Sequence, residues 1–140
     1  MRDYPLGTRR PELVTTPKGL KPTDVTLDAL RQGRLDADDV RATASTIRRQ
    51  AAVALASGRP QLAENLMRAA ELAAIPAEFV LEAYTALRPH RSTAVELAAL
   101  AERLEREHSA PRTAAFVREA LAVYERRGLL AADERRPAPV

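Results

Sequence analysis

Ten prolines divide this 140-residue chain into segments of different character. Four of them, Pro5, Pro11, Pro17 and Pro22, fall within the first 25 residues. Each lacks an amide donor and restricts the residue before it, so no sustained helix is expected there. The segment also carries more apolar side chains than a fully disordered linker would have. We therefore expect residues 1–25 to form an extended proline-rich arm that lies against its own chain or another.

After the arm, the pattern is that of an all-α protein. Apolar residues recur at helical spacing, and no alternating strand pattern of useful length is present. We expect about five short-to-medium helices in a compact bundle, within a helical domain of residues 26–130. Residues 131–140 hold two prolines and mixed charges and are expected to fray.

Capping residues, prolines and glycines mark the expected helix ends. The expected elements are a short helix from Thr26 to about Gly33, a turn over residues 37–42, a helix from Thr43 to about Ser57, and helices beginning near Pro60, Pro76, Thr93 and Pro111, the last ending at Gly128. The five helices from Thr43 onward each have an expected apolar face. In chain order, these faces are Ile47, Ala51, Ala54 and Leu55; Leu62, Leu66, Ala69, Ala70 and Ala73; Val80, Ala83, Tyr84 and Leu87; Leu97, Leu100, Ala101 and Leu104; and Phe116, Val117, Ala120 and Tyr124.

The apolar share of the sequence overstates its capacity to form a core. Hydrophobic residues make up 46% of the chain, but 28 of these residues are alanine and there is no tryptophan. Alanine buries little surface, and small domains are already marginal in stability. We expect a thin core or help from a partner.

Charge and cysteine content exclude several classes. The 22 basic and 19 acidic residues are interspersed, which is typical of solvated helix faces rather than of a nucleic-acid surface. There is no cysteine for a disulfide or a thiolate metal site, which fits a cytoplasmic protein. No segment approaches the roughly 18 apolar residues that a membrane helix needs, so no membrane partner is expected.

No catalytic, cofactor-binding or metal-binding residues stand out. The two histidines, His90 and His108, lack metal-ligand spacing. The neighbouring carboxylates Asp38 and Asp39 are interpreted as favourable charges in a helical first turn. No glycine cluster is present that would bring backbone amides around a phosphate.

The string Arg88-Pro89-His90-Arg91 joins two expected helices and presents two guanidinium groups on a stiff turn. Cations at a helix C-terminus would explain it, because they complement the helix dipole. A contact surface would explain it equally well, since arginine is a frequent anchor at interfaces.

Several blocks of the sequence together resemble one known family. They are Asp3-Tyr4-Pro5-Leu6, Ala69-Ala70-Glu71-Leu72, Ala86-Leu87-Arg88-Pro89 with Arg91-Ser92-Thr93, and Phe116-Val117-Arg118-Glu119-Ala120. In order and in proline spacing they are similar to the small subunit of the adenosylcobalamin-dependent diol and glycerol dehydratases. The resemblance runs from about Asp3 to Leu129.

The resemblance implies a subunit whose chemistry belongs to its partners. Such enzymes assemble from large, medium and small subunits as a dimer of heterotrimers, and convert propane-1,2-diol or glycerol to an aldehyde and water by a radical mechanism. Other subunits bind the adenosylcobalamin. The resemblance also implies a cytoplasmic enzyme, with a bacterial microcompartment as the alternative location.

An interface hypothesis and two rival functions follow. We expect the arm and the arginine turn to contact the large subunit. The alternatives are a helical adaptor of another complex and a small basic nucleic-acid-binding protein. The candidate interface residues are Tyr4, Leu6, Leu13, Val14, Arg88 and Arg91.

Overall fold

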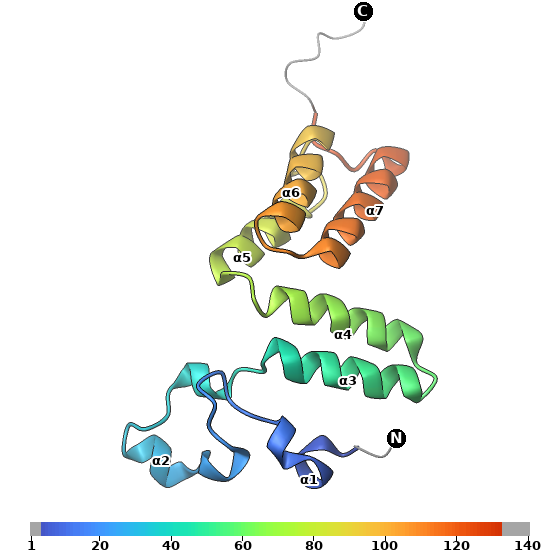
Figure 1. Cartoon of the computed structure of the whole chain (residues 1–140). Coiled ribbons are helices and arrows are strands. Elements are labelled where there is room, and N and C mark those ends of the chain that lie inside the picture. The colour runs from blue at the N-terminus through green and yellow to red at the C-terminus, as the bar shows by residue number, and fades with distance from the viewer. Residues whose placement is uncertain (1–3, 133–140) are drawn as a thin grey trace, which may run out of the picture. The chain divides into compact units, whose positions relative to one another are not determined.

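The computed structural model describes residues 4–132, and all regular structure within that range is helical (Figure 1). The expected all-α class is thereby confirmed. The chain forms two compact units, residues 1–73 and 74–140, so the predicted helical domain of residues 26–130 contributes to both. Most of the predicted tail, residues 133–140, lies outside the described residues. Among the described helices, none has the length and apolarity to cross a membrane.

The proline-rich arm folds into short helical turns. Between residues 4 and 25 the structure has helix α1 (Leu6–Arg9) and the 3-10 helices η1 (Pro11–Leu13) and η2 (Pro22–Asp24). The longest of these has four residues, as expected from the proline spacing. Leu6 is buried, and the Nη1 atom of Arg49 donates a hydrogen bond to the Leu13 carbonyl at 2.7 Å. The arm therefore lies against its own unit.

Two short elements connect the arm to the longer helices. Helix α2 (Leu27–Arg31) is capped by Thr26, whose hydroxyl accepts from the Ala29 amide at 3.1 Å. The 3-10 helix η3 (Ala37–Val40) is capped by Asp36. Both elements agree with the predicted short helix and turn.

Helices α3 (Ala44–Ala56) and α4 (Pro60–Leu72) form an antiparallel hairpin in the first unit (Figure 1). Thr43 caps α3 as predicted, and Gly58 has a φ of 71°, which suits the reversal between the helices. The helices meet through alanine. Their buried core consists of Ala51, Ala54 and Ala63, with Leu66 and Met67 packed against it.

Two leucines predicted to lie on the apolar faces of this hairpin are largely exposed. Leu55 is 62% exposed and Leu62 is 42% exposed. Ala63, which was not on the predicted face, is buried instead. Because alanine side chains are short, α3 and α4 approach closely along an alanine seam, and these bulky leucines lie to the side of it.

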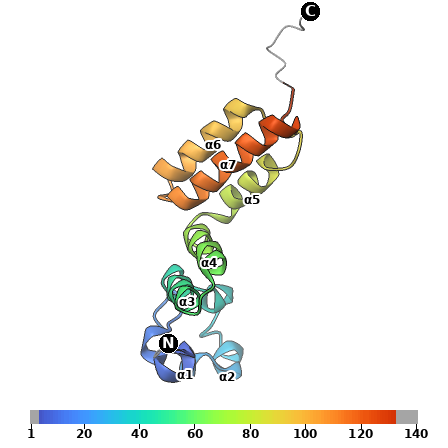
Figure 2. The same ribbon diagram turned by 90° about the vertical axis from the view of Figure 1, so that its right-hand side faces the viewer.

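Helices α5 (Ala77–Ala86), α6 (Ala94–Arg106) and α7 (Pro111–Arg127) make up the second unit (Figure 2). Thr93 and Glu96 form the predicted capping box at the start of α6. Gly128 ends α7 in the left-handed conformation, with a φ of 63°. The predicted α6 stripe is confirmed at every position, and it is buried together with two residues of α7: Leu97, Leu100, Ala101, Leu104, Ala114 and Val117.

Tyr84 and Phe116 were predicted to face the core, and both are exposed. On α5 the buried positions are Phe79 and Ala83. The Phe79 ring lies 4.2 Å from the His108 ring and 4.6 Å from the Arg103 guanidinium carbon. Because Phe79 provides the large aromatic side chain of this part of the core, Tyr84 is left on the outer surface of α5.

Candidate subunit interface

The turn between α5 and α6 is held in a defined conformation. The Ser92 hydroxyl donates to the Ala86 carbonyl at 3.0 Å, and the Arg91 amide donates to the Arg88 carbonyl at 3.2 Å. His90 has a φ of 61°, a conformation uncommon for residues other than glycine. Its amide donates to the Leu129 carbonyl at 2.7 Å, which helps to fix it.

Residues at and beyond the end of α7 also hold this turn through hydrogen bonds. The Tyr124 hydroxyl donates to the Leu87 carbonyl, and the Ala131 amide donates to the Ser92 carbonyl at 2.9 Å. Arg88 and Arg91 are both exposed. The structure therefore presents the two guanidinium groups on a backbone held by hydrogen bonds.

The outer surface of α5 adds apolar area beside the turn. Leu81 is 65% exposed and Tyr84 is 68% exposed. Leu81 and Arg91 line the same surface hollow, of about 600 Å³. This surface was not predicted from the sequence, because helical spacing alone assigned Tyr84 to the core.

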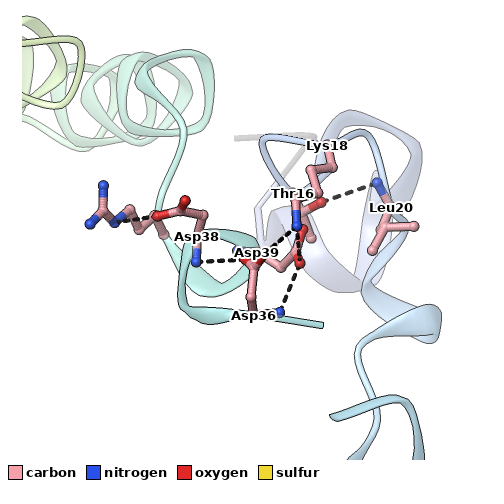
Figure 3. A network of polar contacts seen from close by, with 7 residues as sticks. Thr16, Lys18, Leu20, Asp36, Asp38 and Asp39 are labelled. Atoms are coloured by element: carbon pink, nitrogen blue, oxygen red, sulfur yellow. Dashed lines mark hydrogen bonds and ion pairs between the residues drawn. The ribbon is translucent and has the colours of Figure 1, made fainter. Parts of the chain in front are cut away.

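In the first unit, a polar network joins the arm to η3 (Figure 3). The Nζ atom of Lys18 lies 2.5 Å from Oδ2 of Asp36 and 3.0 Å from Oδ2 of Asp39. The hydrogen bond from Lys18 lowers the pKa of Asp36 below its usual range. The same carboxylates, Asp36 first and Asp39 second, raise the pKa of Lys18.

Asp36 and Asp39 also cap η3 reciprocally. Oδ1 of Asp36 accepts from the Asp39 amide at 3.2 Å, and Oδ2 of Asp39 accepts from the Asp36 amide at 3.0 Å. Asp38 and Asp39 lie in the first turn of η3, as predicted, and Asp38 pairs with Arg41 at 3.3 Å. The signal that the sequence analysis missed is the capping spacing, an aspartate at Asp36 followed by a second three residues later.

The predicted interface residues fall into two groups. Tyr4, Leu6, Leu13 and Val14 belong to the first unit, whereas the arginine pair belongs to the second. Tyr4 is 52% exposed and lines a hollow of about 500 Å³ over α3 and α4. Leu6 is buried, and Leu13 and Val14 are half-buried.

No cluster of metal ligands is formed by the described residues. Among residues 4–132, no group of three histidine, cysteine, aspartate or glutamate side chains is placed to hold a metal ion. The His108 ring packs against the buried Phe79 ring at an interplanar angle of 47°.

The sequence matches one family along nearly its whole length. A family model described as dehydratase small subunit matches residues 1–131. This chain belongs to the dehydratase small subunit family. The resemblance predicted from the proline and arginine blocks is thereby confirmed.

Two curated members of this family are close in sequence. The chain is 46% identical over 132 residues to the propanediol dehydratase small subunit of Citrobacter freundii, covering 94% of this chain and 77% of the relative. It is equally 46% identical over 132 residues to the propanediol dehydratase small subunit of Salmonella typhimurium strain LT2, covering 94% of this chain and 76% of the relative. The family match covers the first compact unit and residues 74–131 of the second.

Proposed function

We propose that this chain is the small subunit of a diol dehydratase, and that its role is to support assembly of the enzyme. The observation that carries the proposal is the family match over residues 1–131, together with 46% identity to two propanediol dehydratase small subunits. The partners are then a large and a medium subunit, in a dimer of heterotrimers.

The reaction assigned to this complex is conversion of propane-1,2-diol or glycerol to the corresponding aldehyde and water by a radical mechanism. Adenosylcobalamin supplies the radical chemistry when bound, and we assign its binding to the other subunits. We place the complex in the cytoplasm, with a bacterial microcompartment as the alternative.

The exposed and the buried members of the predicted interface have different roles in this proposal. Tyr4, Arg88 and Arg91 have exposed side chains, so we assign them direct contacts with the large subunit. The buried side chain of Leu6 and the half-buried ones of Leu13 and Val14 hold the arm in place for such contacts. Replacement of Arg88 and Arg91 by alanine is expected to weaken co-purification with the large subunit without unfolding the chain.

The test is reconstitution. The large and medium subunits are co-expressed with and without this chain, and purified complexes are assayed for diol-to-aldehyde turnover with added adenosylcobalamin. The proposal requires that this chain co-purifies and that stable activity depends on it. Full activity without the chain, together with no co-purification, would overturn it.

A further inference from the structure

Three exposed arginines lie on neighbouring backbone segments at one end of the second unit. Arg88 and Arg91 belong to the turn between α5 and α6, and Arg127 is the last residue of α7. The two segments are joined by the hydrogen bond from the His90 amide to the Leu129 carbonyl, at 2.7 Å. The fold therefore brings cations from two distant parts of the sequence onto one surface, which we call the arginine surface.

Arg127 lies on the face of α7 that holds the turn. The Tyr124 hydroxyl on this face donates to the Leu87 carbonyl. Residues three positions apart share a helix face, so Arg127 lies beside Tyr124. Arg126, two positions from Tyr124, lies about 200° away around the helix axis. The end of α7 therefore has one arginine on the side of the turn and one on the other side.

The arginine surface has no carboxylate partner of its own. The side chains of its three arginines form no hydrogen bond or ion pair among the residues that the structure describes. Elsewhere in the second unit, arginines pair across helices, as Arg103 does with Glu82 at 2.6 Å and Arg118 does with Glu105. Because a guanidinium group can bind a carboxylate through two parallel N–H bonds, the arginine surface retains donors for a carboxylate outside the chain.

The surroundings of the arginine surface do not cancel its charge. Glu125 lies two positions from Arg127 and therefore on another face of α7. Glu78 lines the same hollow as Arg91 but belongs to the first turn of α5, at the opposite end of that helix. The C-terminal ends of α5 and α7 each contribute only about half a negative charge, against three guanidinium groups. The surface is therefore positive, and an acidic surface is its electrostatic complement.

The turn that carries Arg88 and Arg91 needs little ordering when a partner binds. Its His90 has a φ of 61°, and residues held in such conformations are concentrated at functional sites. The Ser92 hydroxyl, which donates to the Ala86 carbonyl at 3.0 Å, also holds the turn. A surface on a fixed backbone loses less conformational entropy on binding, so the arginine surface is suited to a specific contact.

We propose that Arg88, Arg91 and Arg127 together bind a carboxylate-bearing surface of the dehydratase large subunit, with Arg127 pairing with an aspartate or glutamate. The inference rests on the proposed function for the identity of the partner. It deepens that function by adding Arg127 to the contact and by naming the chemistry of the surface that the contact meets. A protein that binds a nucleic-acid duplex typically makes about 6–10 phosphate contacts, which is more than this surface offers.

The first experiment is carbodiimide cross-linking in the assembled enzyme. The reagent joins a lysine Nζ to a carboxylate as an amide, with loss of water. The wild-type chain has two lysines, Lys18 and Lys21, so a lysine introduced elsewhere gives its own identifiable cross-linked peptide. Arg127→Lys is expected to give an amide to an aspartate or glutamate of the large subunit, identified by mass spectrometry. Arg126→Lys, on the other side of α7, is the matched control and is expected to give no such product.

The second experiment is a competition during assembly. Two differently tagged small subunits, one wild-type and one variant, are co-expressed with the large and medium subunits, and their ratio in the purified complex is measured. Arg127→Glu is expected to lower incorporation about tenfold, because it brings like charges together. Arg126→Glu makes the same charge change at the same helix end, and its incorporation is expected to stay within about twofold of wild type. A loss confined to Arg127→Glu therefore does not come from a weakened helix end.

The outcomes separate this inference from its rivals. A cross-link from Arg127→Lys to the large subunit, with low incorporation of Arg127→Glu alone, supports it. Normal incorporation of Arg127→Glu without that cross-link would overturn it and leave the proposed function standing, as would equal losses in Arg126→Glu and Arg127→Glu. A cross-link to the medium subunit instead would also overturn it.

A nucleic-acid partner is tested with the free chain. Binding of duplex DNA that Arg127→Glu abolishes, together with normal incorporation of this variant into the complex, would assign the arginine surface to nucleic acid and overturn the inference. Failure of the wild-type chain to enter the complex would overturn the proposed function itself.

Discussion

The two compact units of this chain are built from the same secondary structure but from different core residues. The hairpin of α3 and α4 packs through Ala51, Ala54 and Ala63. In the second unit, Leu97, Leu104 and Val117 are the largest fully buried side chains. A buried leucine contributes about 1.5–3 kcal/mol, and an alanine far less because it buries little area.

The second unit therefore has an ordinary hydrophobic core, whereas the first unit depends on other contacts. The first unit adds the arm, with the hydrogen bond from Arg49 to Leu13, and the Lys18 network. It also has exposed apolar side chains on Leu27 and Val40. We infer that the second unit is the stable half of the chain and that the first is completed by its partner.

The largest effect is expected from a leucine in the core of the second unit. Leu104→Ala removes a fully buried side chain and leaves a cavity, so the free energy of unfolding should fall by about 3 kcal/mol. Leu55→Ala, in the first unit, is the matched control, because Leu55 is mostly exposed. Its effect should remain within about 0.5 kcal/mol. Chemical denaturation followed by circular dichroism measures both, and equal losses would contradict the contrast between the cores.

A smaller effect is expected where α7 braces the arginine turn. Tyr124→Phe removes the hydroxyl that donates to the Leu87 carbonyl. The expected cost is about 1 kcal/mol, with faster hydrogen exchange at the His90 amide. Tyr84→Phe is the matched control, since Tyr84 is exposed on α5, and it should change neither quantity. An unchanged exchange rate at His90 in Tyr124→Phe would show that the turn does not depend on this bond.

The smallest effect is expected from pH, and it should be confined to the first unit. The pKa of Asp36 is lowered in the folded chain by the hydrogen bond from Lys18. The contribution of this group is therefore complete above its ordinary pKa of 3.8 and is lost as the pH falls through its lower folded value. Because the pKa of Lys18 is raised, its contribution is lost only at alkaline pH, above its ordinary value of 10.5.

The measurement is an NMR titration of amide signals between pH 6 and about pH 2. Signals around Lys18 and Asp36 should broaden or shift at lower pH before those of α6 do. Lys18→Met should move this transition to higher pH, because the pKa of Asp36 is then no longer lowered by its largest cause. Simultaneous changes in both units of the wild-type chain would contradict the assignment to this network.

Helix boundaries were predicted from the sequence because their causes are local. Thr26, Thr43 and Thr93 accept hydrogen bonds from amides within three residues. Pro60 and Pro111 occupy first helical positions, where the missing amide has no cost. Such signals need no knowledge of tertiary structure. The lack of a long helix between residues 4 and 25 followed from the prolines in the same way.

The buried faces were predicted well only where leucine dominates. The α6 stripe from Leu97 to Leu104 was correct because large side chains define a single face. In α4, the buried face consists of Ala63 and Ala70, and periodicity could not distinguish Leu62 from its neighbour Ala63. Helical spacing likewise placed Tyr84 in the core. It did not reveal that Phe79 would be the buried aromatic side chain of α5.

The Lys18 network was beyond prediction for a different reason. Lys18 meets Asp39 across 21 positions of sequence, and no local pattern predicts such a meeting. The interface hypothesis of the arm and the arginine turn came from composition and resemblance, and the structure divides its residues between the two units.

Hydrogen–deuterium exchange of the free chain and of the assembled dehydratase tests the central contrast most directly. If the first unit is completed by its partner, amides of α3 and α4 exchange quickly in the free chain and gain protection in the complex. That gain should exceed the gain in α6 and α7 by about tenfold or more. Equal protection of both units in the free chain, with no larger gain in the first on assembly, would contradict this account.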